Sequence, residues 1–228
     1  MTVPERLREP RATKSSTDGR ETCPVAFKIQ MAMGKSKKDD FYLLTLLNHS
    51  ANPIKVTVLG DSLSQWSNTF GLSQKLPSTY KVTDLSVAGY DTALWISELS
   101  RAEIVPTDIW IIELGTNDAS YSGTNGFKER YMEILNRLKQ RTFSYFLLST
   151  VPKTNQNGLH QSILSNNEVI RELVKTDPAY RLADLEKVFS EKSDSVILYP
   201  LNDPIHPNGI GYELIGEEYR KLLLGFQI

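Results

Sequence analysis

The chain has 228 residues, of which 40% are hydrophobic and 23% charged, and its formal net charge is −1 at pH 7. A chain of this length can bury one sizeable hydrophobic core and still carry an appended tail. The balanced charge and a pI near 6.3 exclude the basic surface that binding to nucleic acid or to an anionic membrane requires. No apolar run is long enough to span a bilayer. We therefore expect neither nucleic acid as a partner nor an integral membrane segment.

Residues 1–50 are polar, rich in Arg, Lys, Glu, Thr and Ser, and show no sustained periodicity. We expect them to form an N-terminal extension with one short helix at about 40–48, where an apolar run occurs. This run is short, and Asp39 and Asp40 precede it, which opposes a signal peptide and favours a cytoplasmic protein. The single cysteine, Cys23, excludes an intramolecular disulfide and a cysteine-based metal cluster.

From residue 51 to residue 228, apolar runs with strand character alternate with amphipathic segments of helical period. Strands are predicted at 54–59, 81–87, 109–114, 142–150 and 180–185. Helices are predicted at 65–75, 92–101, 127–141, 161–175 and 211–224. This alternation is typical of an α/β domain, and the predicted fold is a three-layer α/β/α sandwich with a mostly parallel five-stranded sheet.

Ser62 follows the first predicted strand, whose apolar residues end abruptly in Gly60-Asp61-Ser62. In an open α/β sheet, ligands bind beyond the carboxyl ends of the strands, so the Ser62 hydroxyl is expected in a crevice. A backbone N–H at the start of the next helix can stabilise negative charge there. The alternative interpretation is that Ser62 only caps this helix.

Two further strand ends carry groups that can bind an oxyanion. Gly89 allows close approach of its backbone N–H to a substrate oxygen, and Asn117 offers a neutral N–H₂ donor. Each residue also has a simpler explanation. Gly89 can be a turn residue that ends a strand, and Asn117 can form an Asx turn or a helix cap.

A general base must be one of three histidines. His49 and His160 are expected at the surface, whereas His206 directly precedes the last predicted helix. Asp203, three residues upstream, is close enough in a turn to accept a hydrogen bond from the ring. A carboxylate that orients an imidazole beside a hydroxyl is the arrangement of a Ser-His-Asp triad. The alternative is a capping turn with an exposed histidine.

Taken in order, these blocks resemble the SGNH hydrolase (GDSL esterase/lipase) superfamily from about residue 54 to residue 224. The blocks are Gly60-Asp61-Ser62-Leu63-Ser64, Ala88-Gly89, Gly115-Thr116-Asn117-Asp118 and Asp203-Pro204-Ile205-His206. One departure is Asp84, which stands five residues before Gly89 where many members have asparagine. Another is Tyr90, which separates Gly89 from Asp91-Thr92.

The resemblance implies a flavodoxin-like sandwich and a role for each matched residue. Ser62 would be the nucleophile, His206 the general base and then acid, and Asp203 the residue that orients it. The backbone N–H groups of Ser62 and Gly89 and the side chain of Asn117 would form the oxyanion hole. No metal and no organic cofactor are implied.

The expected function is that of a serine esterase acting on a small-molecule ester with a short to medium acyl group, a carbohydrate O-deacetylase being one form. Residues 119–126 and 152–160 are candidate specificity loops, and their polarity favours a short acyl group on a polar alcohol. A lysophospholipase or acyl thioesterase with a preference for longer chains is an alternative. A non-catalytic α/β binding protein is the alternative from a different class. The oligomeric state stays open.

Overall fold

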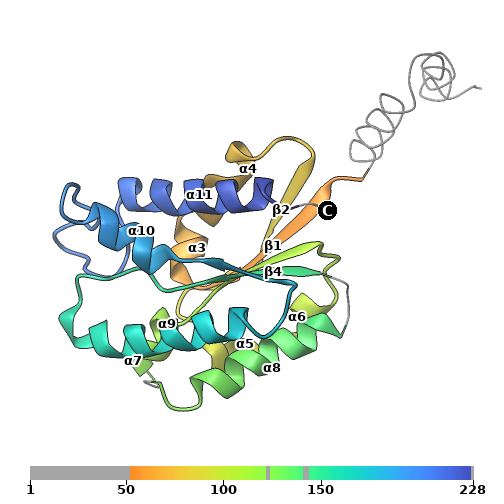
Figure 1. Ribbon diagram of the computed structural model, residues 1–228, viewed down its shortest axis with the longest axis horizontal. Coiled ribbons are helices and arrows are strands. Elements are labelled where there is room, and N and C mark those ends of the chain that lie inside the picture. Colours follow the sequence, from red (N-terminus) through yellow and green to blue (C-terminus); the bar gives the residue numbers. More distant parts are fainter. Residues whose placement is uncertain (1–51, 122–123, 141–143, 227–228) are drawn as a thin grey trace, which may run out of the picture. The chain divides into compact units, whose positions relative to one another are not determined.

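The computed structural model describes residues 52–121, 124–140 and 144–226. Within these residues, five strands form one sheet in the order β2-β1-β3-β4-β5, and every neighbouring pair is parallel (Figure 1). The strands are β1 (Ile54–Gly60), β2 (Tyr80–Asp84), β3 (Ile109–Glu113), β4 (Tyr145–Ser149) and β5 (Tyr180–Ala183). This is the flavodoxin-like strand order, and the predicted α/β class is confirmed.

Helices cover both faces of the sheet, as Figure 1 shows. One layer contains α3 (Ser62–Trp66), α4 (Leu72–Lys75), α10 (Leu185–Lys192) and α11 (Gly209–Leu224). The other contains α5 (Thr92–Glu98), α6 (Ser100–Glu103), α8 (Phe127–Lys139) and α9 (His160–Val174). The shorter elements are α7 (Thr116–Tyr121) and the 3-10 turns η1 (Thr69–Gly71) and η2 (Asn157–Leu159).

Alternation along the central strands divides the core into two halves. Val58 and Ile111 point to the cluster beneath α11, whereas Leu59 and Ile112 point to the cluster beneath α5, α8 and α9. All residues of β3 are buried, as expected for a parallel strand that is covered on both faces. The carboxyl ends of β1 and β3 therefore emerge side by side from a rigid core, with Gly60 paired to Glu113.

The single helix predicted at 65–75 is wrong. The chain breaks after α3, because Asn68, Thr69 and Phe70 all adopt left-handed backbone conformations with φ between 52° and 57°. This conformation is costly for non-glycine residues. It turns the Phe70 ring into the core, where the ring lies 5.3 Å from that of Tyr219 on α11. Burial of the ring offsets the backbone cost.

Other differences concern segment ends and short helices. The second predicted strand ends early at Asp84, whose carboxylate accepts the N–H of Ser86 at 2.8 Å and turns the chain. Helices α7 and α10 were not predicted; α10 begins at an Asp184 cap whose side chain accepts the Lys187 N–H at 3.2 Å. The predicted extension 1–50, its helix at about 40–48, Cys23 and His49 lie outside the described residues.

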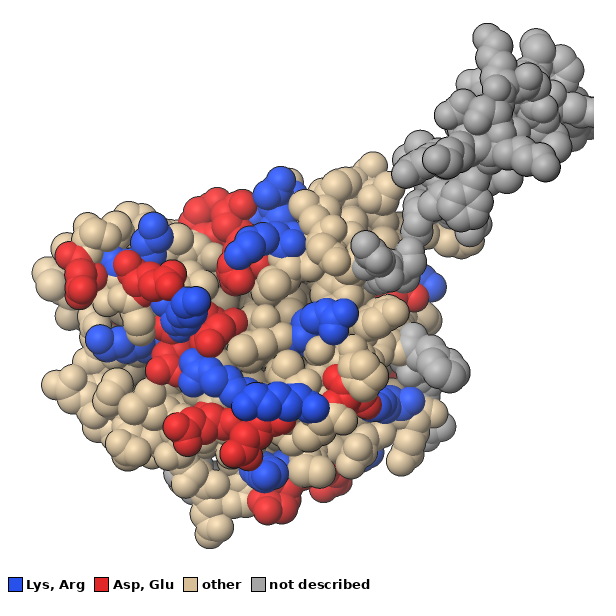
Figure 2. Space-filling model, viewed as in Figure 1, with Lys and Arg blue, Asp and Glu red and all other residues tan. Residues whose placement is uncertain are grey.

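Charges of both signs are interspersed on the face drawn in Figure 2. Lysine and arginine side chains lie beside aspartate and glutamate side chains, so neither sign forms a continuous patch on this face. This distribution agrees with the small net charge. Among the described residues, no helix combines the length and the apolar character needed to cross a membrane.

Candidate active site

Ser62 is the first residue of α3, at the sharp turn that follows β1. The helix is capped by Asp61, whose carboxylate accepts the backbone N–H of Leu63 at 2.9 Å. The interpretation of Ser62 as the cap is therefore wrong, and its hydroxyl is available for another contact. The turn also requires Gly60, because a Cβ at this position would lie 1.9 Å from Ser64 Oγ.

The Ser62 hydroxyl meets the loop before α11. Ser62 Oγ lies 2.9 Å from His206 Nε2, and His206 Nδ1 lies 2.8 Å from Asp203 Oδ2. Asp203 Oδ1 also accepts the N–H groups of Ile205 at 3.0 Å and of His206 at 2.9 Å. With the ring proton on Nδ1, facing the carboxylate, Nε2 is free to accept the serine proton. The structure thus brings Ser62, His206 and Asp203 into one hydrogen-bonded chain.

Asp203 is held as a carboxylate by its local hydrogen bonds. Partial burial acts to raise its pKa, but the donors from His206 and Ile205 outweigh this effect and lower the pKa below the ordinary value. A carboxylate that stays charged at low pH can stabilise the imidazolium that forms when His206 takes a proton.

Gly89 lies in a turn beside the Ser62 helix. The Tyr90 N–H donates to Val87 O at 3.1 Å, and Gly89 has φ +82°, a conformation that favours glycine. Gln65 on α3 ties this turn to the serine, since its Oε1 accepts the Ala88 N–H at 2.9 Å. Space is open where a Cβ of Gly89 would point.

Asn117 connects the two turns. Its Nδ2 donates to Tyr90 O at 2.9 Å, next to Gly89, and lies 3.4 Å from Asp61 Oδ2, next to Ser62. The side chain comes from α7, which follows the end of β3. The three residues predicted to supply oxyanion donors, Ser62, Gly89 and Asn117, therefore converge at the carboxyl edge of the sheet.

A buried carboxyl pair lies beneath the serine turn, and the sequence interpretation missed one of its members. Glu113, the last residue of β3, is 1% exposed and accepts a hydrogen bond from Ser64 Oγ at 3.0 Å. Burial and the nearby Asp61 carboxylate raise the pKa of Glu113 well above its ordinary value, while burial is also the main cause that raises the pKa of Asp61. Asp61 therefore disfavours the ionised form of Glu113, whereas the Glu113 side chain acts to lower the pKa of Asp61. A glutamate inside the otherwise apolar run 109–114 was the available signal.

The Asp118 side chain holds the segment that carries Asn117 against two neighbouring helices. Its carboxylate accepts the Thr92 N–H at 3.1 Å and the Thr92 hydroxyl, and Arg130 Nη2 approaches it at 3.2 Å. It thereby joins the start of α5 and a side chain of α8 to the segment that carries Asn117. Burial is the main reason that the pKa of Asp118 is raised, against the effect of these donors.

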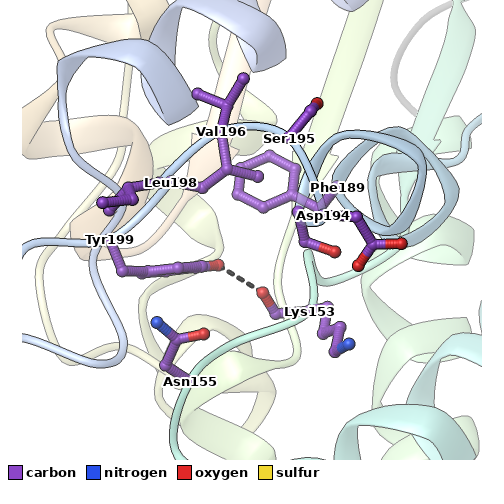
Figure 3. A pocket seen from close by; sticks show the side chains of 10 residues that line it. Lys153, Asn155, Phe189, Asp194, Ser195, Val196, Leu198 and Tyr199 are labelled. Carbon is purple, nitrogen blue, oxygen red and sulfur yellow. Dashed lines mark hydrogen bonds between the residues drawn. The ribbon is translucent and has the colours of Figure 1, made fainter.

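A cavity of about 370 Å³ lies beside the His206 loop. Phe189 and Leu198 line it together with polar side chains that include Lys153, Asn155 and Asp194, as the close view in Figure 3 shows. The Tyr199 hydroxyl donates to Lys153 O at 2.6 Å, a bond that is drawn in the same view. Ser62, Asp203 and His206 do not line this cavity.

The two segments predicted as specificity loops differ in their structure and in their position relative to the cavity. In the segment 152–160, Lys153 and Asn155 line the cavity, and the Asn155 N–H donates to Pro204 O at 2.8 Å, within the loop that carries His206. The segment 119–126 is partly helical, because α7 continues to Tyr121. His160, expected at the surface, is exposed at the start of α9.

Fold and site together define an α/β protein with a serine, a histidine and an aspartate in one hydrogen-bonded chain at the carboxyl edge of a parallel sheet. A family model for the GDSL-like Lipase/Acylhydrolase family matches residues 58–214. The chain belongs to this family, and the resemblance to the SGNH hydrolases is confirmed. This family is one of lipases and acylhydrolases, as its description states.

Among curated proteins, a multidomain esterase from Ruminococcus flavefaciens is 28% identical over 127 residues, which are 52% of this chain and 16% of that protein. The match therefore spans a small part of that relative's length. Two of the matching solved structures illustrate the shared fold. One is an acetylxylan esterase from Geobacillus stearothermophilus, with TM-score 0.64 and 13% identity over 76% of this chain and 95% of that one. The other is the catalytic domain of a peptidoglycan O-acetyltransferase from Streptococcus pneumoniae. Its TM-score is 0.59, and it is 18% identical over 75% of this chain and 93% of that domain.

Proposed function

We propose that this protein hydrolyses short-acyl esters, above all acetyl esters, of a polar alcohol such as a carbohydrate, and that the acyl group passes through Ser62. The observation that carries the proposal is the chain of two hydrogen bonds from Ser62 Oγ to His206 Nε2 at 2.9 Å and from His206 Nδ1 to Asp203 Oδ2 at 2.8 Å. A nucleophile, a base and an orienting carboxylate at these distances meet the geometric requirement for acyl transfer.

In the proposed reaction, Ser62 Oγ attacks the ester carbonyl carbon and its proton passes to His206 Nε2. The tetrahedral intermediate then expels the alcohol, whose oxygen takes that proton, and leaves the acyl group on Ser62. A water molecule next gives its proton to Nε2 and attacks the acyl carbon. When this second intermediate collapses, the acid departs and Ser62 regains its proton.

The oxyanion of both intermediates would be bound by backbone N–H groups of Ser62 and Gly89 and by Asn117 Nδ2. As the first residue of α3, Ser62 has a backbone N–H with no acceptor within the helix. The bond from Asn117 Nδ2 to Tyr90 O at 2.9 Å orients the amide, and its second hydrogen, whose contact with Asp61 Oδ2 is long at 3.4 Å, would turn to the oxyanion. Such preorganised donors lower the barrier to acyl transfer.

Two observations support the short acyl group and the polar alcohol. Lys153 and Asn155 supply polar side chains to the cavity beside the loop that carries His206, and the Asn155 N–H donates to Pro204 O in that loop. In addition, the solved structures that share the fold include an acetylxylan esterase and a peptidoglycan O-acetyltransferase, both named for acetyl groups on glycans. These names belong to those proteins, and they are the reason to test acetyl esters first.

The test compares wild type and Ser62→Ala on p-nitrophenyl acetate, butyrate, octanoate and laurate. We expect kcat/KM to fall with chain length, and Ser62→Ala to lose about 10⁴-fold or more with an unchanged Tm. Rates that rise with chain length would instead support a lysophospholipase or an acyl thioesterase. Failure of Ser62 to react with a fluorophosphonate probe, together with no hydrolysis, would support a non-catalytic binding protein.

A further inference from the structure

The proposed reaction fixes where the alcohol half of the ester must lie. His206 Nε2 gives its proton to the departing oxygen, so this oxygen must come within hydrogen-bonding distance of Nε2. Nε2 already lies 2.9 Å from Ser62 Oγ. The acyl group is attached to Ser62 and faces the donors near Gly89 and Asn117. The alcohol therefore leaves along the imidazole ring of His206.

The side chain that covers this ring is Trp66. Its ring centroid lies 4.2 Å from that of His206, and the two ring planes are inclined by 37°. Trp66 is the last residue of α3, four residues after Ser62. Residues at this spacing project from the same face of a helix, so the indole and the nucleophilic hydroxyl flank the same imidazole.

Trp66 is also one of the large apolar residues that the structure leaves in contact with solvent. It is 60% exposed, whereas the His206 side chain is 20% exposed. An indole that served only to pack against His206 would gain more from burial. The exposed part of the indole therefore offers a flat apolar surface with a polar N–H directly beside the ring of His206.

We propose that Trp66 binds the alcohol half of the substrate, and that the alcohol it fits is a saccharide ring. The flat indole face matches the C–H face of a pyranose, and its ring N–H can donate to a hydroxyl group of the sugar. Trp66 thus determines selectivity for the leaving alcohol and leaves selectivity for the acyl group unchanged. This inference rests on the proposed function, because it needs an ester that is cleaved at Ser62.

The experiment compares two acetyl esters that give the same acetyl-enzyme and differ only in the alcohol. One is an acetylated methyl xyloside and the other is ethyl acetate. Wild type, Trp66→Ala and Trp66→Phe are assayed on both, with Ile104→Ala as a matched control. Ile104 is a large apolar residue that is 80% exposed, and it follows α6 near the opposite edge of the sheet, before β3 begins.

For Trp66→Ala we expect kcat/KM on the xyloside acetate to fall about tenfold or more, mainly through KM, and kcat/KM on ethyl acetate to change by less than about threefold. Trp66→Phe should keep a substantial part of the xyloside activity because it retains an aromatic face. Ile104→Ala should leave both substrates unaffected, and Tm should be similar in all four proteins.

Equal losses on both esters would overturn the inference, because Trp66 would then act through His206 alone. No loss on either ester would overturn it as well. These outcomes leave the proposed function intact, since wild type still hydrolyses an acetyl ester in a Ser62-dependent way. If the wild type cleaved neither ester and Ser62→Ala made no difference, the proposed function would fail and the inference with it.

Discussion

Ser62 and His206 lie 2.9 Å apart, yet the segments that carry them are held in different ways. The serine turn rests on the core: Ser64 Oγ donates to Glu113 on β3, and Glu113 is 1% exposed. The histidine loop is held at the surface by short-range bonds, chiefly those from the N–H groups of Ile205 and His206 to Asp203.

Because of this difference, we expect substitutions near Ser62 and substitutions near His206 to affect folding stability and catalytic activity differently. Hydrogen bonds within a buried network are costly to break, because each lost partner leaves a desolvated polar group. Bonds within a half-exposed loop can be replaced by water at little cost. Changes on the histidine side should therefore affect the reaction and spare the fold, whereas changes on the serine side should affect the fold as well.

The largest effect is expected from Asp203→Asn. The asparagine oxygen can still accept the local N–H groups, but it supplies no charge to orient His206 and to stabilise its imidazolium. We expect kcat/KM to fall about 10³- to 10⁴-fold. Because the Asp203 side chain is 34% exposed, stability should change by less than about 1 kcal/mol. Acetate-ester kinetics and thermal unfolding measure both, and a large loss of stability would contradict the contrast between the two sides.

An intermediate effect is expected from Gly60→Ala on the serine side. The new Cβ would meet Ser64 Oγ at 1.9 Å and Ser64 Cβ at 3.1 Å. The Ser64 side chain would have to move and would lose its hydrogen bond to Glu113. We therefore expect a loss of about 1–3 kcal/mol in the free energy of unfolding. Urea unfolding measures it. The matched control is Gly158→Ala, where a Cβ would meet nothing within 4 Å, and equal stability of the two variants would contradict this expectation.

The smallest effect is a change in the pH dependence of stability in Glu113→Gln. Burial and the Asp61 carboxylate raise the pKa of Glu113 above its ordinary value of 4.5, so the folded state holds this proton more tightly than the unfolded chain does. Stability from this group is complete below pH 4.5 and is lost as pH rises toward the raised pKa. Glutamine cannot ionise, so the Tm of the variant relative to wild type should rise by about 2 °C or more between pH 5 and pH 8.

The measurement is a set of thermal unfolding curves from pH 5 to pH 8. Burial also raises the pKa of Asp61, to about 7, and this effect has the same sign. A residual fall in stability with pH is therefore expected in Glu113→Gln. Lys128→Gln, at an exposed ion pair with Glu172, serves as a control that should keep the wild-type pH dependence. A constant Tm difference between Glu113→Gln and wild type would contradict the prediction.

Much of the fold could be predicted because its strands are short apolar runs between clear turn signals. The run 109–114 is apolar on both faces, and β3 lies in the middle of the sheet. The helix predicted at 65–75 failed because local propensity gave no indication of the left-handed turn at Asn68, Thr69 and Phe70. That turn is favoured by the packing of Phe70 against Tyr219, residues far apart in the sequence.

The sequence by itself determined the chemical groups of the site and their order along the chain: a serine after the first strand, a glycine and an asparagine at later strand ends, and an aspartate three residues before a histidine. These are local patterns, set by the side-chain types that acyl transfer needs. Only the tertiary structure decided which groups surround them. Glu113 meets Asp61 and Trp66 meets His206 because parallel strands and a distant loop end at one edge of the sheet. Contacts of this kind depend on the relative placement of whole elements, and this placement is fixed by burial in the core, which no local pattern records.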